Sequence, residues 1–88
     1  MKIEFSPVFK KSYRKRILKN AILRSRFEEK LTLLQLNPFD PKLETHKLSG
    51  LLKDRLAFSV TYDCRVIFSF KGKETIVLLD IGTHEQVY

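Results

Sequence analysis

The chain has 88 residues, 43% of them hydrophobic, with a net charge of +7 and one cysteine. This length predicts a single domain, residues 1–88, with a thin core. No apolar run reaches the roughly 20 residues that cross a bilayer, which argues against a membrane partner. The lone cysteine excludes an internal disulfide, so the cytoplasm is the expected compartment.

The positive charge gathers at the N-terminal end. Residues 1–30 hold ten lysines and arginines against three glutamates, whereas residues 31–88 hold seven basic and seven acidic residues. A basic block beside a neutral half favours a polyanionic partner, most often a nucleic acid. The alternative is a solvated helix face that keeps the protein soluble.

The first predicted elements are a short strand and a helix. Residues 2–5 alternate polar and apolar side chains, as a half-buried strand does. Ser6 and Pro7 are typical of a helix start, with a capping side chain followed by proline at the first helical position. Apolar residues then recur at helical spacing at Val8, Phe9, Tyr13 and Ile17.

A second, longer helix is predicted after residues 19–20, where the apolar pattern resets. It ends at residues 37–38, because the residue before a proline avoids helical geometry. Its apolar stripe consists of Ile22 or Leu23, followed by Phe27, Leu31 and Leu34.

The remaining segments are predicted strands. Residues 43–48 are a weak candidate, and residues 56–62 and 64–70 alternate with period two. A hairpin loop at residues 71–73 leads to residues 76–81, whose nearly continuous apolar run predicts a central or fully covered strand. The order predicts an α+β fold: an N-terminal strand, two helices and an antiparallel meander of three to four strands, with the helices packed on one sheet face.

Strand parity divides the two faces of the predicted sheet. The alternating apolar residues that should face the helices are Phe58, Val60, Val66, Phe68 and Phe70. Ser59, Thr61 and Arg65 then point outward, onto a face expected to be open, polar and partly basic.

The sequence shows no motif for a metal or a cofactor. His46 and His84 are the only histidines, Cys64 stands alone, and no phosphate-binding glycine loop occurs. We therefore expect no metal site and no cofactor.

Four residues are candidates for chemistry. Arg65 could clamp a phosphate with its guanidinium, or pair with a carboxylate across the sheet. His46 and His84 could carry protons near neutral pH, or be surface residues without a role. Tyr88 could stack on a base, or pack against the sheet edge.

Three segments resemble the RelE/ParE superfamily of bacterial toxins, which belong to type II toxin–antitoxin systems. Residues 65–68 (Arg-Val-Ile-Phe) and 78–88, ending Gly-Thr-His-Glu-Gln-Val-Tyr, are similar to the superfamily, and residues 45–50 (Thr-His-Lys-Leu-Ser-Gly) to its YafQ branch. The resemblance implies a RelE-like fold over the whole chain. It also implies an endoribonuclease that cuts mRNA on the ribosome without a metal and so inhibits translation.

The resemblance further implies catalytic roles for particular residues. Arg65 matches a strand arginine that contacts the scissile phosphate, and His84 matches a histidine of the terminal loop. Tyr88 matches an aromatic residue that orients a base or joins catalysis. His46 and Asp63 match a histidine and an aspartate of the YafQ branch.

Some positions depart from the family pattern. Ser59 or a neighbour stands where the YafQ branch has a second strand histidine, and Asp80 replaces a last-strand arginine. The paired lysines of RelE have no counterpart among residues 56–59. Because each acid–base group contributes about 10²–10⁴ in rate, these departures predict either a weak nuclease or one that works with a reduced set of catalytic groups.

The expected partners are mRNA, the ribosome and a cognate antitoxin. The antitoxin should be an acidic, partly disordered protein that folds on the toxin in a hetero-oligomer. Two alternatives stay open: a ParE-like toxin that binds DNA gyrase without catalysis, and a basic RNA-binding module. The expected RNA-binding residues are Lys10, Lys11, Arg14, Lys15, Lys47 and Arg55.

Overall fold

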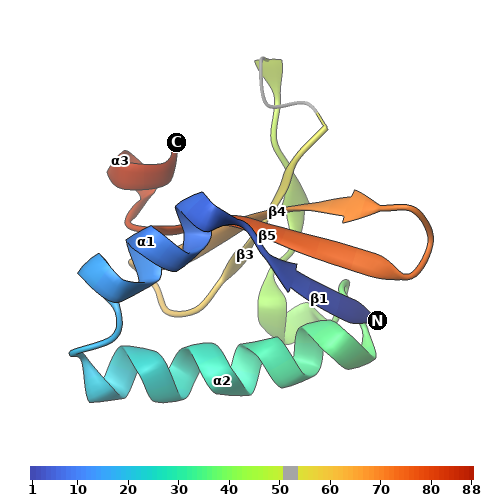
Figure 1. Ribbon diagram of the computed structural model, residues 1–88. Helices are drawn as coiled ribbons and strands as arrows, with labels where there is room; N and C mark the ends of the chain where they lie inside the picture. Colours follow the sequence, from blue (N-terminus) through green and yellow to red (C-terminus); the bar gives the residue numbers. More distant parts are fainter. Residues whose placement is uncertain (51–53) are drawn as a thin grey trace.

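The computed structural model describes residues 1–50 and 54–88 (Figure 1). Its elements are β1 (Lys2–Phe5), α1 (Pro7–Arg16), α2 (Ala21–Leu36), the 3₁₀ helix η1 (Pro41–Leu43), β2 (His46–Lys47), β3 (Leu56–Ser59), β4 (Arg65–Lys71), β5 (Thr75–Gly82) and α3 (His84–Val87). Within the described residues the five strands form one sheet in the order β1-β5-β4-β3-β2. β1 runs parallel to β5, and the other neighbours are antiparallel.

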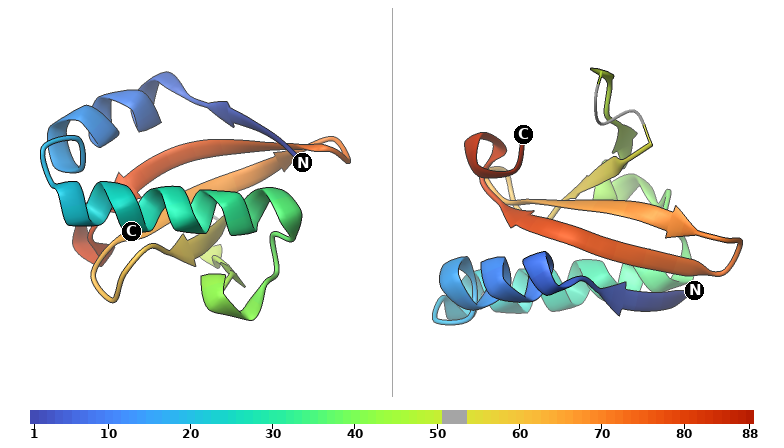
Figure 2. Two further views of the ribbon diagram at one scale, coloured as in Figure 1. Left: turned by 90° about the horizontal axis from the view of Figure 1, so that it is seen from below. Right: turned by 45° about the horizontal axis from the view of Figure 1, so that its top comes forward.

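The helices divide between the two faces of the sheet. Helices α1 and α2 cover one face, and the short α3 lies on the opposite side, where it packs against β4 and β5 (Figure 2). The predicted α+β fold, with an antiparallel meander and its two helices on one face, is therefore confirmed. The described part of the chain has no helix with the length and apolar character of a bilayer span.

Helix α1 begins as the sequence predicts. The Ser6 Oγ accepts a hydrogen bond from the Phe9 N–H at 3.0 Å, and Pro7 occupies the first helical position. Phe9 is 2% exposed in the core, but Val8 is 59% exposed. The prediction that Val8 joins the apolar stripe is wrong, because Phe9 and Ser12 occupy the face of α1 that turns toward the protein interior.

The structure of helix α2 shows which of Ile22 and Leu23 belongs to the apolar stripe. The Asn20 Oδ1 caps the helix by accepting a hydrogen bond from the Leu23 N–H at 3.1 Å. Leu23 packs against the core, whereas Ile22 is 73% exposed. The helix ends at Leu36, directly before the predicted stop.

Two strands are shorter than predicted. β2 covers only two residues of the predicted 43–48, because η1 precedes it and Glu44 adopts a left-handed backbone with φ of 52°. β3 ends before the predicted residue 62, because the Val60 N–H donates to the Cys64 carbonyl at 2.8 Å and closes a turn.

The core lies between the sheet and helices α1 and α2. Its fully buried side chains include Leu34, Phe58, Val66, Phe68, Ile76 and Leu78. Phe70 is 39% exposed and stacks on Phe39, whose ring centroid lies 6.2 Å away. Phe70 lies on the same face as Phe68, as predicted, with its ring centroid 5.8 Å away, but its further partner comes from the loop that follows α2 rather than from a helix.

The outward face of the sheet is less open than predicted. Ser59 and Arg65 are cross-strand partners on this face, where both were expected to point, but Ala57 and Ile67 on the same face are also buried. Ile67 lines a cavity together with Val87 of α3. The physical reason is that α3 folds back over this face and covers part of it.

Candidate active site

Four side chains gather on the outward face, where β4 begins and β5 ends. His46 belongs to β2, Arg65 opens β4, His84 opens α3, and Tyr88 is the C-cap of α3. We call these four residues the site cluster. The His46 Nε2 and the Tyr88 Oη lie 3.1 Å apart, although 42 positions separate the two residues.

The Tyr88 ring lies between the two histidines. The edge-on contact with His84 has a centroid distance of 4.3 Å, and the contact with His46 has a distance of 6.5 Å. A phenol between two imidazoles places three groups that can exchange protons side by side.

The hydrogen bonds of His46 define its ring orientation. Its Nδ1 lies 3.1 Å from the Glu44 carbonyl oxygen, which can only accept, so the Nδ1 carries the proton. In the neutral ring the Nε2 is then an acceptor and the Tyr88 hydroxyl donates to it. The left-handed Glu44 turn thus points the basic nitrogen of His46 toward Tyr88.

Arg65 supplies the positive charge of the site cluster. It is half-buried and donates to the Ser59 Oγ. Among the described residues it makes no ion pair with a carboxylate, so the cross-sheet pairing that the sequence left open does not occur. Burial raises the pKa of Tyr88, and the nearby Arg65 charge lowers it by less. Tyr88 is therefore protonated at neutral pH and acts as a donor.

A capping box orders the end of the chain. The Thr83 Oγ1 accepts a hydrogen bond from the Gln86 N–H at 3.3 Å, and the Gln86 Oε1 accepts one from the Thr83 N–H at 2.8 Å. The Tyr88 N–H donates to the His84 carbonyl at 3.0 Å. These local bonds hold both side chains of α3 that belong to the site cluster.

Asp63 lies apart from the site cluster. It sits in the turn between β3 and β4 and lines a cavity of about 420 Å³ that Lys15, Arg16, Thr83 and Gln86 also line. None of the four residues of the site cluster lines this cavity. The structure therefore brings Asp63 near the start of α3, but not into the group that surrounds Tyr88.

The expected RNA-binding residues divide between the two faces. The four on α1 are exposed, and α1 belongs to the helix layer on one side of the sheet (Figure 2). Lys47 is exposed directly after His46, and Arg55 lines the cavity beneath α3. Of these four α1 residues, Lys15 is the one that lines the cavity that reaches α3.

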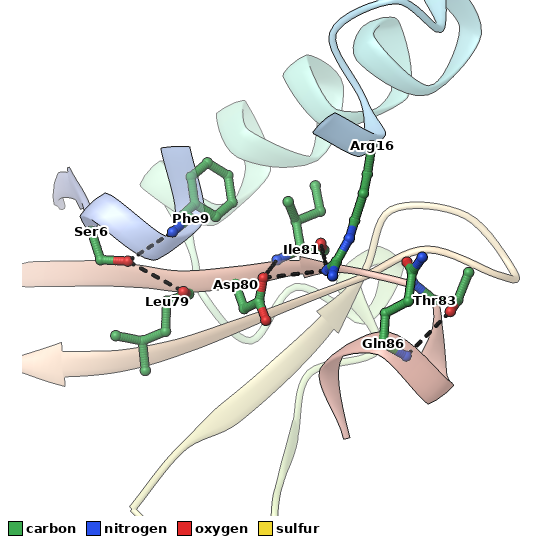
Figure 3. Close-up of polar contacts among 8 residues, drawn as sticks. All are labelled: Ser6, Phe9, Arg16, Leu79, Asp80, Ile81, Thr83 and Gln86. Carbon is green, nitrogen blue, oxygen red and sulfur yellow. Dashed lines mark hydrogen bonds and ion pairs between the residues drawn. The ribbon is translucent and has the colours of Figure 1, made fainter. Parts of the chain in front are cut away.

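The sequence reasoning missed one charged residue near the site. Arg16 donates to the Ile81 carbonyl at 2.9 Å, and its Nη1 lies 3.6 Å from the Asp80 Oδ1 (Figure 3). The available signal was Asp80 itself, because a carboxylate within an apolar strand needs a partner. Nothing in the local pattern says that the partner comes from the end of the first helix.

The described residues contain no group of three or more histidine, cysteine or acidic side chains that could hold a metal ion. A comparison with curated protein sequences found no match.

Solved structures of bacterial toxins share the fold. A metal-bound toxin from Helicobacter pylori is 27% identical with a TM-score of 0.82, and the match covers 100% of this chain and 99% of that chain. The YoeB/ParE toxin from Agrobacterium tumefaciens is 14% identical with a TM-score of 0.82, covering 96% and 99%. A chain of the E. coli DinJ–YafQ complex is 23% identical with a TM-score of 0.74, covering 98% and 96%.

The family model that describes YafQ, a bacterial toxin of a type II toxin–antitoxin system, matches residues 1–88. This match extends over both the helical half and the site cluster. The chain therefore belongs to the YafQ family of toxins from bacterial type II toxin–antitoxin systems.

Proposed function

We propose that this toxin is an endoribonuclease that cleaves mRNA and so inhibits translation. The observation that carries the proposal is the site cluster, in which His46, Arg65, His84 and Tyr88 meet from three elements of the fold. A protein that only binds its target needs no such group of proton carriers beside a guanidinium.

The proposed reaction uses the 2′-hydroxyl of the RNA as the nucleophile. A base removes the proton of that hydroxyl, and the 2′-oxygen attacks the adjacent phosphorus. The bond from phosphorus to the 5′-oxygen breaks, and an acid gives a proton to this leaving oxygen. The products are a 2′,3′-cyclic phosphate and a free 5′-hydroxyl, with no net change in protons.

The side chains of the site cluster provide the groups that this reaction needs. Arg65 stabilises the charge that grows on the phosphate, because a guanidinium matches phosphate oxygens. His84 is the first candidate for the proton carrier, and His46 is the second. Tyr88 positions a base or the phosphate with its ring and its protonated hydroxyl.

Single substitutions test the proposal. Arg65→Ala and His84→Ala should each reduce the cleavage of ribosome-bound mRNA by about 10²-fold or more while the fold is kept, since His84 is exposed and Arg65 lies outside the apolar core. Circular dichroism and thermal unfolding check the fold, and Lys73→Ala in the distant β4–β5 hairpin is the matched control. If both site variants cleave normally, the assignment of the site is wrong.

The DNA gyrase alternative has a different readout. A ParE-like toxin would inhibit gyrase supercoiling and leave mRNA intact, whereas the nuclease should cut mRNA and leave gyrase active. Running both assays on one preparation separates the two functions.

We also propose that an acidic antitoxin holds the toxin inactive. A groove of about 460 Å³ lies between α1 and α2, and we call it the α1–α2 groove. Lys10 and Arg14 line it beside a single acidic residue, Glu28. Its apolar lining consists of Phe5, Phe9, Tyr13, Phe27 and Leu31.

This groove suits an amphipathic segment that carries acidic residues along one edge. The E. coli relative was crystallised as a DinJ–YafQ complex, which supports assembly with a second protein. An antitoxin in the groove would also cover Lys10 and Arg14, two of the four α1 residues that are expected to bind RNA.

A further inference from the structure

The first half of β5 pairs with the strand β1 along one edge. Along the same edge, the second half of β5 bonds to helix α1 and its capping residue. β1 pairs with β5 only as far as Leu78. Beyond that point α1 takes over: the Ser6 Oγ donates to the Leu79 carbonyl at 3.2 Å. At the other end of α1, the Arg16 Nη1 donates to the Ile81 carbonyl at 2.9 Å (Figure 3). The first and last turns of α1 therefore satisfy carbonyls that a strand would otherwise bind.

Arg16 reaches around this edge to the outward face. Its guanidinium lies 3.6 Å from the Asp80 Oδ1, and both side chains are about one-quarter exposed, at 24% and 26%. The same Asp80 oxygen accepts a hydrogen bond from the Ile81 N–H at 2.9 Å. The arginine is therefore held at two points, a backbone carbonyl and an oriented carboxylate.

Gly82 leaves the space in which α1 and α3 meet. A β-carbon at this position would lie 2.8 Å from the Arg16 Nη1 and 2.6 Å from the Gln86 Oε1. Both distances are far below normal contact, so any larger residue would displace both groups. The Gln86 oxygen is also part of the capping box that begins α3. The end of α1 and the start of α3 thus share one packed junction over Gly82.

Helix α3 depends on contacts outside itself. It has only four residues, and a helix of that length has no stability of its own. It nevertheless carries two members of the site cluster, His84 and Tyr88. Its position therefore decides how far the Tyr88 hydroxyl lies from the His46 ring.

We propose that Arg16 is a positioning residue of the site cluster: by bonding the end of β5 it fixes α3, and with α3 the places of His84 and Tyr88. Arg16 does not need to touch the RNA for this role. The activity part of the test rests on the proposed nuclease function, whereas the structural part does not.

The test compares Arg16→Gln, which removes the charge but keeps a donor, with Arg16→Lys, which keeps the charge. The matched control is Arg26→Gln, because Arg26 also pairs with a carboxylate at 3.6 Å but lies exposed on α2. Thermal unfolding first establishes that each variant is folded. Gly82→Ala is the second variant, which crowds the junction without removing a charge.

Proton NMR reports directly on the site. In the parent protein and in Arg26→Gln we expect nuclear Overhauser contacts between the Tyr88 ring and the rings of His46 and His84. Arg16→Gln and Gly82→Ala should weaken both contacts, and Arg16→Lys should keep part of them. Since burial raises the pKa of Tyr88, a displaced α3 should also bring that pKa back toward about 10.

Activity supplies the second readout. Misplacing a reacting group by about 1 Å can cost about 10²-fold, so Arg16→Gln should lower kcat by about 10- to 100-fold with little change in KM. Unchanged ring contacts in folded Arg16→Gln would overturn the proposal. A parent protein that does not cleave RNA at all would refute the nuclease function instead, and the ring contacts would still decide the role of Arg16.

Discussion

Cys64 is a buried thiol directly before the arginine of the site cluster. It is 4% exposed, and its backbone N–H donates to the Thr61 Oγ1 at 3.2 Å. Burial raises the pKa of the Cys64 thiol to about 11, and the neighbouring Arg65 charge offsets part of that effect. The thiol is therefore neutral at physiological pH and a poor nucleophile, which argues for packing rather than chemistry.

The raised pKa makes stability depend on pH. Because the folded thiol binds its proton more tightly than the unfolded one, its contribution is complete below about pH 8.5 and is lost as the pH rises to about 11. We expect the free energy of unfolding to fall by about 2 kcal/mol more in the parent protein than in Cys64→Ala across this range. Urea unfolding at each pH measures the difference.

The comparison with Cys64→Ala is needed because two tyrosines titrate in the same range. Burial also raises the pKa values of Tyr13 and Tyr88, so both contribute to the slope in either protein. Equal slopes for the parent and Cys64→Ala would contradict the assignment to the thiol.

At the residue scale, the sequence predicts which residues could take part in chemistry better than it predicts which residues they contact. Arg65 could be recognised as a candidate from its outward position on a strand, and His84 from its place after the last strand. The contact between His46 and Tyr88 could not, because it joins two segments through the return of α3 over the sheet. The role of Arg16 could not be predicted for the same reason, because the tertiary fold decides which groups a long side chain can bond.

Helix α1 depends on its first capping residue in two ways. The Ser6 Oγ accepts a hydrogen bond from the Phe9 N–H at 3.0 Å and donates one to the Leu79 carbonyl at 3.2 Å. Ser6→Ala should lower the free energy of unfolding by about 1–2 kcal/mol, because both the cap and the link to β5 are lost. Thermal or urea unfolding measures this loss, with the exposed Ser25→Ala on α2 as the control, which should change stability by less than about 0.5 kcal/mol.

The basic side chains of α1 and α2 differ in whether they bond to other groups of the protein. On α2, Arg24 and Lys30 donate to backbone carbonyls, and Arg26 pairs with Glu29. Within the part of the chain that the structure describes, the basic residues of α1 other than Arg16 make no side-chain hydrogen bond or ion pair. They are therefore available to an external polyanion.

We expect α1 to bind ribosomal RNA through these available charges. The variant that tests this replaces Lys10, Lys11, Arg14 and Lys15 with glutamine. Its affinity for ribosomes should fall, and the slope of log affinity against log salt should flatten by about three, since fewer counterions are released. Replacing the three basic residues of α2 named above is the control, which should change the slope by less. Equal slopes for the parent and the α1 variant would leave the block as a surface for solubility or for the antitoxin.

At the element scale, the order and type of the helices and strands could be predicted from the sequence, but the ends of several strands could not. The alternating pattern that includes Tyr62 continues past the end of β3, yet Tyr62 is 91% exposed at the tip of a turn. Alternation reports which residues could pair, whereas the hydrogen bond from Val60 to Cys64 decides where pairing stops. The parallel placement of β1 beside β5 also has no local signature.

At the scale of the whole molecule, the two proposed functional surfaces lie on opposite sides of one thin sheet. Helix α3 lies on one side of the sheet and helices α1 and α2 lie on the other (Figure 2). The site cluster includes His84 of α3, whereas the α1–α2 groove is lined mainly by residues of α1 and α2. Because Lys10 and Arg14 line the groove, an acidic partner bound there would compete with RNA for the same charges. Inhibition would then not require the partner to touch His84 or Tyr88.

Charge reversal tests where the antitoxin docks. We expect Lys10→Glu combined with Arg14→Glu to weaken binding of the acidic partner that co-purifies from the native host by at least about tenfold, with a smaller salt dependence. Isothermal titration calorimetry measures the affinity. Lys2→Glu combined with Lys73→Glu changes the net charge equally but spares the groove, and should bind nearly as well as the parent. Equal weakening by the two pairs would show that only net charge matters.

The parallel pairing of β1 with β5 has a consequence for how the protein folds during its synthesis. Lys2 pairs with Thr75, so the first strand must wait for the last one before it has a neighbour in the sheet. Such long sequence separations slow folding, because the chain loses the entropy of closing the loop before the new contacts can offset that loss. On a translating ribosome, β1 and α1 emerge long before β5, and His84 and Tyr88 emerge after it. The site cluster therefore cannot assemble before β5 and α3 have both emerged from the ribosome.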